Sequence, residues 1–314
     1  SYQQPTGSRF GGDALYQGEN RKRGAQISYF VTIDKKDEDK KNKDEDENTD
    51  VLEEKDEDKN SIKWDSLTMK IYDGERLIRT LKQKAPKETG IHKSTWQLNE
   101  KGPDRVSRTI RKHDNESGGL TVKPGTYKIV LHFGDQISED VITVESDPRL
   151  NKSSNAIDEI YKVSKNIESM TQTVAEAVKQ LVESKQIAET YKSELKKLDK
   201  EKYKDPIKAS KDIIKKIEDL ITLYLGKEDK RQGITRNPEV TISQQIRLAN
   251  AYISSRPDGL TSTETTLLEH ATKALKDGID KTNSFFNEDW KTYKNAMEEI
   301  NISPFKDVKS FKLN

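Results

Sequence analysis

Residues 122–160 read VKPGTYKIVLHFGDQISEDVITVESDPRLNKSSNAIDEI, and the hydrophobic pattern changes its period within them. Apolar and polar residues alternate over 126–133, which is typical of a strand with one buried face. After the Asp-Pro dipeptide at 147–148, apolar residues recur three and four positions apart, as they do on one face of a helix. The sequence therefore predicts a β domain that ends near residue 150 and a helical domain that follows it.

Short strand patterns separated by turn residues fill the region before this stretch. They occupy 24–33, 66–72, 77–81 and 90–98, and 141–144 closes the set. Turn signals about every 8–12 positions are typical of an antiparallel sandwich. We therefore expect a fibronectin- or immunoglobulin-like antiparallel β-sandwich over 24–150, in which Gly118 and Gly119 mark a loop.

Four amphipathic helices are expected in the second half of the chain. Their expected positions are 151–198, 205–226, 242–253 and 261–300. Asp205 would cap the second helix with Pro206 as its first helical residue, and Thr261 would form a capping box with Glu264. Two long helices among the four predict an elongated up-down four-helix bundle over 151–302. The expected fold class is thus α+β with more than one domain.

The two ends of the chain differ in composition from the predicted domains. Residues 1–23 are rich in Gly, Gln and Arg, and we expect a linker or a strap there. Residues 303–314 are expected to form a tail that packs back on the bundle. The chain begins without Met and without a signal-like apolar segment, so we expect a mature product or a fragment of a longer protein.

The formal net charge of +1 is the sum of two unlike parts. Residues 34–60 carry 14 acids and 7 lysines, a net charge of −7, and the rest of the chain carries +8. Such a stretch buries too little apolar surface to fold, so a disordered insertion at a hairpin tip is expected. Asp44, Asp46 and Asn48 alternate as in a calcium loop, but Thr and Lys stand where that loop needs Gly and Glu. The insertion would therefore bind a cation weakly at most, or attract a basic partner.

The sequence lacks the signatures of several enzyme classes. The absence of cysteine excludes disulfides, thiolate zinc sites, iron–sulfur clusters and a cysteine nucleophile. We find no phosphate loop, dinucleotide fingerprint, HExxH or GxSxG motif, so no catalytic residue and no cofactor are expected. The scattered histidines lack metal-ligand spacing; they are His92, His113, His132 and His270. The near-neutral charge predicts no nucleic acid partner, and no apolar run predicts a transmembrane segment.

Aromatic residues are the remaining candidates for contact with a ligand or partner. Trp64 borders the acidic insertion, and Phe285 and Trp290 belong to an aromatic group near the end of the last helix. Most of that group is expected in the bundle core, with one or two residues free to contact another domain. Trp96 and Tyr127 are further candidates for a carbohydrate face, although the alternation in their strands favours burial.

Four stretches, in this order, resemble the C-terminal region of bacterial sortilin-like β-propeller proteins, often labelled exo-sialidase-repeat or glycosyl-hydrolase-like. The first is GENRKRGAQISYFV at 18–31, and the second is MKIYDGERLIRTL at 69–81, followed by GIHKSTWQL. The third is VKPGTYKIVLHFGDQ at 122–136, which runs on to ESDPRL. The fourth is the helical region, with a W-x-x-Y step in its last helix and an ISPF tail.

The resemblance implies an upstream β-propeller as partner and export to the periplasm, the outer-membrane surface or the extracellular space. No catalytic residue of the family maps onto this chain. Two functions are therefore open. One is a non-catalytic module that braces or docks the propeller among other cell-envelope proteins. The alternative is an accessory carbohydrate-binding region of a secreted glycosyl-hydrolase-like protein.

Overall fold

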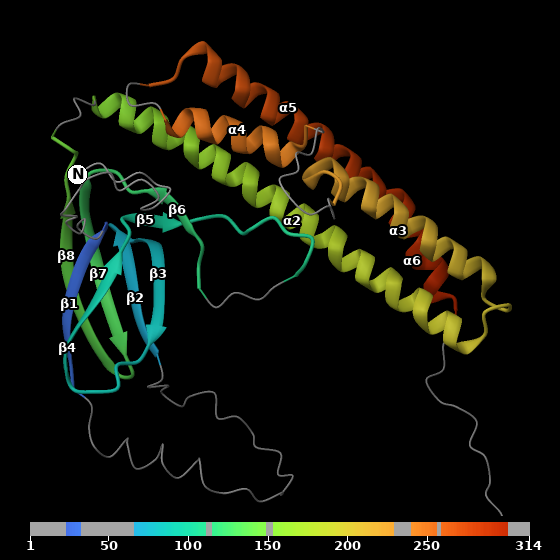
Figure 1. Cartoon of the computed structure of the whole chain (residues 1–314), viewed down its shortest axis with the longest axis horizontal. Coiled ribbons are helices and arrows are strands. Elements are labelled where there is room, and N and C mark those ends of the chain that lie inside the picture. The colour runs from blue at the N-terminus through green and yellow to red at the C-terminus, as the bar shows by residue number, and fades with distance from the viewer. Residues whose placement is uncertain are drawn as a thin grey trace, which may run out of the picture.

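The computed structural model describes residues 23–32, 66–110, 115–148, 153–228, 240–255 and 259–300. Antiparallel sheets precede a set of helices, which confirms the expected α+β class. In Figure 1 the strands lie at the lower left, and the helices extend from above them to the right. The expected strap, the acidic insertion and the C-terminal tail lie outside the described residues, apart from Arg23 at the end of the strap.

The described residues of the β part form eight strands. They are β1 (Ala25–Val31), β2 (Ser66–Asp73), β3 (Arg76–Lys84), β4 (Gly90–Trp96), β5 (Asn99–Lys101), β6 (Gly118–Thr121), β7 (Gly125–Phe133) and β8 (Gln136–Val144). One sheet has the order β3-β2-β7-β8, and β1-β4 and β5-β6 form two-stranded sheets. All of these pairings are antiparallel.

The apolar core of the β part lies between the β1-β4 pair and the four-stranded sheet. Met69, Ile71 and Ile129 of the larger sheet pack there with Trp96 of β4, and Ile27 of β1 lies against them. Trp96 meets Tyr127 edge-on, with 5.5 Å between the ring centroids. The expectation that these two aromatic residues are core residues is confirmed.

Two differences from the predicted strands concern short or exposed segments. Gly118 and Gly119, expected in a loop, belong to β6, which is too short to show a period of its own. β8 begins at Gln136 instead of near residue 141, because it is an edge strand whose first residues are all exposed. A strand without a buried face leaves little alternation in the sequence.

The helical part contains two long helical segments and two shorter helices. They are α2 (Ser154–Leu198), α3 (Lys204–Leu225), α4 (Ile242–Ser254) and α5 (Ser262–Phe285), which continues through the π turn η3 (Phe286–Trp290) into α6 (Lys291–Glu298). In Figure 1, α4 and α3 follow one another along α2, with α5 and α6 beside them. One apolar core runs through all of them and includes Leu181, Ile217 and Ile253.

Two details of the helices were not predicted. α3 begins at Lys204, one residue before the expected cap Asp205, so that Pro206 is its third residue. Proline fits there because backbone N–H groups in the first turn lack helical acceptors. The π turn lengthens one turn of the last helix by a residue and brings Phe286 and Trp290 together, with their ring centroids 6.4 Å apart.

The capping box at the start of α5 is confirmed: the Glu264 carboxylate accepts a hydrogen bond from the Thr261 backbone N–H at 2.9 Å. Glu264 is fully buried. Thr261→Ala is expected to lower the free energy of unfolding by about 1 kcal/mol, because an N-cap is lost. Thr272→Ala, at an exposed site within the same helix, is the matched control. Urea unfolding followed by circular dichroism would measure both, and equal losses would contradict the capping role.

Candidate functional site

The short strand β5 places one carboxylate, that of Glu100, between the sheets and α2. Two features of the residues just before Glu100 fix the path of the backbone. The Trp96 indole N–H donates to the Asn99 carbonyl at 2.9 Å, and Leu98 adopts a left-handed backbone conformation with φ 55°. A left-handed non-glycine residue is uncommon and costs on the order of 1 kcal/mol, so the surrounding contacts must hold it. The Glu100 side chain is consequently only 5% exposed.

Glu100 binds three side chains from two parts of the molecule. Arg76 of β3 donates from Nη1 to Oε2 at 2.9 Å and from Nη2 to Oε1 at 3.1 Å. From α2, Lys165 Nζ lies 2.9 Å from Oε2, and the Tyr161 hydroxyl donates to Oε1. These four residues form the junction cluster. A carboxylate offers about four lone-pair positions, so its acceptor capacity is filled.

The electrostatics of the junction cluster favour the ionised form of Glu100. Burial alone raises the pKa of this carboxyl group, but the hydrogen bonds from Arg76, Tyr161 and Lys165 outweigh burial and hold the pKa at about 2. Burial also raises the pKa of Tyr161. For Lys165, burial lowers the pKa, yet the Glu168 and Glu100 carboxylates outweigh it and raise the pKa overall. At neutral pH the cluster therefore holds fixed charges and has no group ready to exchange a proton.

A second carboxylate, Glu168 of α2, joins the helix to β6. It accepts from the Leu120 backbone N–H at 2.8 Å and binds Lys165 Nζ at 2.8 Å. One turn further along α2, Gln172 accepts from the Asp104 backbone N–H at 2.9 Å. Side chains of α2 thus bind the backbone of β6 at Leu120 and of the segment that follows β5 at Asp104.

Arg79 of β3 holds the other side of β5-β6. Its guanidinium is buried and donates to the carbonyl groups of Glu100, Glu116 and Ser117. The Glu116 carboxylate in turn accepts from the Thr80 backbone N–H at 2.8 Å. The β5-β6 pair therefore lies as a connecting piece between the edge of the larger sheet and the long helix.

Close backbone approach at this connection requires glycine. A Cβ atom on Gly102 would lie 2.5 Å from the Gly118 carbonyl oxygen and 2.8 Å from the Gly119 Cα atom, which are backbone atoms that cannot turn away. Gly102→Ala is expected to cost about 1–3 kcal/mol of unfolding free energy, as overpacking does in a filled core. A thermal melt would measure this loss.

Gly125→Ala is the control for that prediction. A Cβ atom at Gly125 would meet only the Tyr127 ring, at 3.8 Å, which is ordinary contact. Equal melting temperatures for the two variants would contradict the close approach at Gly102.

A cavity of about 400 Å³ lies beside the junction cluster. Leu120, Val122 and Pro124 line it from the β part, and Ile157, Ile160 and Tyr161 line it from α2. Lys123 stands at its edge and is paired with Asp158 at 2.7 Å. The cavity is mostly apolar, and its one lysine is already neutralised by a carboxylate.

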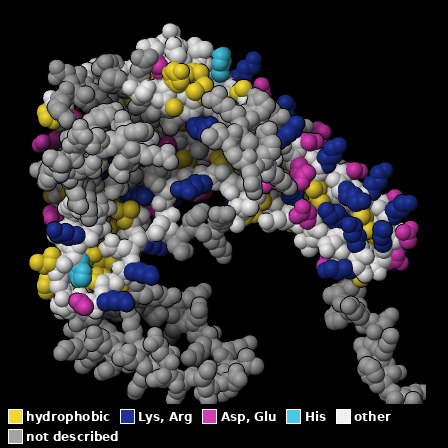
Figure 2. Space-filling view, in the orientation of Figure 1, with side chains coloured by type: hydrophobic (Ala, Val, Ile, Leu, Met, Phe, Trp, Pro, Cys, Tyr) yellow, Lys and Arg dark blue, Asp and Glu magenta, His cyan; other side chains and the backbone are white. Residues whose placement is uncertain are grey.

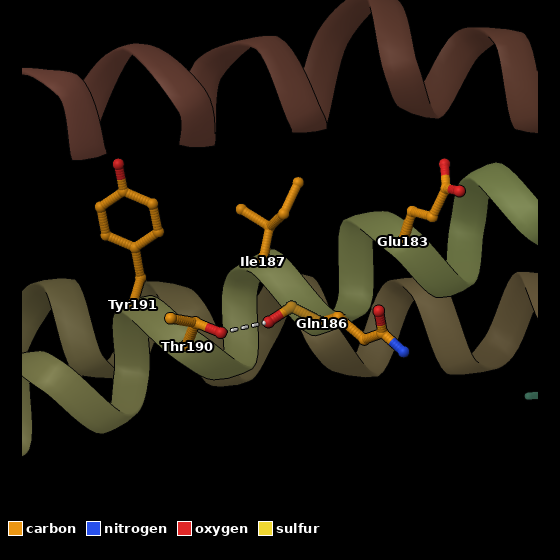
Figure 3. A pocket seen from close by; sticks show the side chains of 5 residues that line it. All are labelled: Glu183, Gln186, Ile187, Thr190 and Tyr191. Carbon is orange, nitrogen blue, oxygen red and sulfur yellow. Dashed lines mark hydrogen bonds between the residues drawn. The ribbon is translucent and has the colours of Figure 1, made fainter. Parts of the chain in front are cut away.

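A shallow groove of about 480 Å³ lies further along α2 and is shown in Figure 3. Glu183, Ile187 and Tyr191 point across it toward the neighbouring helix. The Thr190 hydroxyl donates to the Gln186 carbonyl at 2.9 Å, so it serves the helix itself. One acid, one amide and two hydroxyls without a base or a second acid among them do not form a recognisable catalytic set.

The residues predicted to contact a ligand or partner are not brought together. Phe285 is buried in the helical core, where it contacts Phe286 and Trp290, and Trp290 is partly buried against the same core. Trp96 and Tyr127 are buried, which leaves the carbohydrate hypothesis without these two as exposed aromatics. Trp64, the calcium-loop candidates Asp44, Asp46 and Asn48, and His113 lie outside the described residues. Three histidines are described, and they lie on different elements: His92 on β4, His132 on β7 and His270 on α5.

Among the described residues, no three His, Cys, Asp or Glu side chains are grouped so that they could hold a metal ion. No helix in the described ranges is long and apolar enough to span a membrane. Figure 2 shows Lys and Arg side chains interspersed with Asp and Glu at the far end of the helices, which agrees with a solvated surface.

Sequence reasoning did not identify the junction cluster. Glu100 is 24 residues from Arg76 and 61 from Tyr161, and no spacing rule connects them. The sequence signal nearest the junction is the Gly118-Gly119 pair, which is typical of a loop.

Comparison with known proteins adds no relative. No family model matches the chain, and neither a curated protein nor a solved structure matches it.

Proposed function

We propose that this chain is a non-catalytic structural and protein-interaction module. The observation that carries the proposal is that the Glu100 carboxylate uses all of its acceptor positions to bind Arg76, Tyr161 and Lys165. The most buried ionised group of the junction cluster therefore holds β3, β5 and α2 together. A catalytic acid or base needs a proton to exchange and a position open to substrate. Tyr161 lines the neighbouring cavity, but the Glu100 carboxylate is ionised at neutral pH and its acceptor positions are filled, so the cluster is suited to fixing two parts of the molecule relative to one another.

We also propose a specific architecture for the β part and for the helical part. We take the β1-β4 pair and the four-stranded sheet as a fibronectin- or immunoglobulin-like sandwich, since a shared apolar core lies between them. We take the helices as an elongated up-down bundle, since α2 is 45 residues long and contacts α3, α4 and α5. A rigid pair of this kind suits a spacer or a brace.

The sequence motifs extend the proposal to a parent protein. In it, the chain is the C-terminal part of an exported sortilin-like β-propeller protein and braces or docks the propeller in a cell-envelope assembly. The support for this step is the order of the four motif stretches, from 18–31 to the helical region.

The test is direct binding between separately produced parts. The polypeptide encoded immediately upstream of Ser1 would be expressed alone and titrated with this chain in a calorimeter. The proposal expects a one-to-one complex with a dissociation constant in the micromolar range or below. Lack of binding, or an upstream sequence without propeller repeats, would reject the propeller as the partner.

A further inference from the structure

The two outer edges of the four-stranded sheet differ in how they are covered. On β3, the Thr80 backbone N–H is bound by Glu116 and Arg79 holds the adjacent segment, so this edge is occupied by β5-β6 and the residues beside them. On β8, no strand among the described residues pairs with the outer side. An unpaired edge strand is a template for another strand, and natural proteins protect such edges unless they use them.

The backbone of β8 shows which groups are available. The Val141 N–H is bound by the carboxylate of its own neighbour Asp140, at 2.8 Å, and not by β7. Since N–H groups alternate between the two sides of a strand, those of Ile137, Glu139 and Thr143 point to the same outer side as that of Val141. The Asp140 side chain is exposed, so its carboxylate can rotate away from the Val141 N–H. That N–H group then becomes available to a partner strand.

The side chains of β8 give the edge two distinct faces. Ile137 and Val141 lie on one face, and each is 62% exposed. Asp140 lies on the opposite face, because successive side chains of a strand alternate. Glu139 lies between them on the same face, where Lys128 of β7 pairs with it at 3.2 Å. Two exposed apolar side chains therefore flank one paired acid beside the outward backbone groups.

The charged residues of β8 and of the short segments that flank it are all acidic. Residues 134–148 contain five acids and no lysine or arginine. One of them, Glu139, is paired with Lys128 of β7 at 3.2 Å. A second copy of β8 placed against this edge would bring like charges together, whereas a basic strand would be attracted.

We propose that the free edge of β8 binds an extended strand of a partner protein in which apolar and basic side chains alternate. The partner strand would extend the sheet by backbone hydrogen bonds to the outer side of β8. Its apolar side chains would lie beside Ile137 and Val141, and its basic side chains would lie on the face of Asp140. This inference rests on the proposed interaction role and names one surface for it.

The probe for this surface is an acetylated and amidated nonapeptide, KVKVKVKVK, with EVEVEVEVE as its charge-reversed counterpart. Fluorescence anisotropy would measure binding, and hydrogen exchange would locate it. We expect the basic peptide to bind, with weaker affinity at higher salt, and to slow exchange of the outward amides of β8. The acidic peptide should not bind.

Two variants and a control make the test specific. Val141→Pro removes an outward donor without removing a hydrogen bond to β7, and prolines are tolerated on that side of an edge strand. It should weaken binding of the basic peptide at least tenfold. Asp140→Asn retains the hydrogen-bond acceptor but loses the charge, so it should reduce the salt dependence. Ile91→Lys removes an apolar residue of β4 that is even more exposed, at 75%, and should leave binding unchanged.

Several results would overturn the proposal. They are absence of binding by the basic peptide, equal binding of both peptides, and equal loss of binding in Val141→Pro and Ile91→Lys. Self-association of the unmodified chain that disappears in Val141→Pro would assign the edge to a second copy instead. None of these results bears on binding of the upstream polypeptide, so the two proposals fail separately.

Discussion

Replacing Trp96 by alanine is expected to lower the free energy of unfolding of the β part by about 3–5 kcal/mol. The side chain is fully buried, packs edge-on against Tyr127, and donates a hydrogen bond to the Asn99 carbonyl. Its removal leaves a cavity between the two sheets and an unpaired carbonyl group next to Glu100. Because a domain is stable by only about 5–15 kcal/mol, this loss takes up a large part of the total. Urea unfolding followed by circular dichroism would measure it.

Trp96→Phe separates the two contributions. It retains most of the aromatic contact with Tyr127 but has no N–H group for Asn99, so we expect a loss of about 1–3 kcal/mol, typical of a buried acceptor left unpaired. In both variants the hydrogen exchange of the central turns of α2, far from the β core, should stay slow. A Trp96→Ala variant as stable as the unmodified chain would show that the β core does not depend on this residue.

The burial of Trp96 illustrates what the sequence could predict. Alternation in its strand and in the strand of Tyr127 pointed to a core position, and the structure has both residues there. The capping box of Thr261 and Glu264 was equally predictable, because its residues are three positions apart and satisfy each other's backbone groups. Both patterns depend only on residues that are close together in the sequence, so they can be recognised without knowledge of the fold.

The junction cluster could not be predicted in the same way. Arg76, Glu100 and Lys165 come from a hairpin, a three-residue strand and a helix, and each alone has the sequence context of an ordinary surface charge. Their meeting depends on the left-handed turn at Leu98 and on the glycine contacts of β5-β6, which have no periodic signature. The helices, by contrast, are predictable because each has a long apolar stripe.

The second large effect concerns the charge of Glu100. Its folded-state pKa of about 2 lies below the ordinary value of 4.5, so ionisation stabilises the folded state. This stabilisation is fully present above about pH 4.5 and is lost as pH falls toward 2. A difference of about 2.5 pKa units corresponds to about 3 kcal/mol. Unfolding free energies measured between pH 6 and pH 2 should therefore decrease less steeply in Glu100→Gln than in the unmodified chain.

At neutral pH, Glu100→Gln should also lower the stability by about 2–3 kcal/mol, because Arg76 and Lys165 are left facing a neutral amide. This figure lies below the usual cost of breaking a buried ion pair, since the Arg76 side chain is half exposed. Glu75→Gln, an exposed acid in the adjacent hairpin turn, is the control and should change neither the stability nor its pH dependence.

The same variant reports on the relation between the sheets and the helices. Since the chain has no cysteine, Lys93→Cys and Lys276→Cys would place two dyes at exposed positions, one on β4 and one on α5. Energy transfer in single molecules should give one narrow distribution for the otherwise unmodified chain. Adding Glu100→Gln should broaden that distribution if the junction cluster fixes the two parts. An unchanged distribution together with the expected loss of stability would limit Glu100 to holding β5 against β3, and it would remove the main support for a rigid brace.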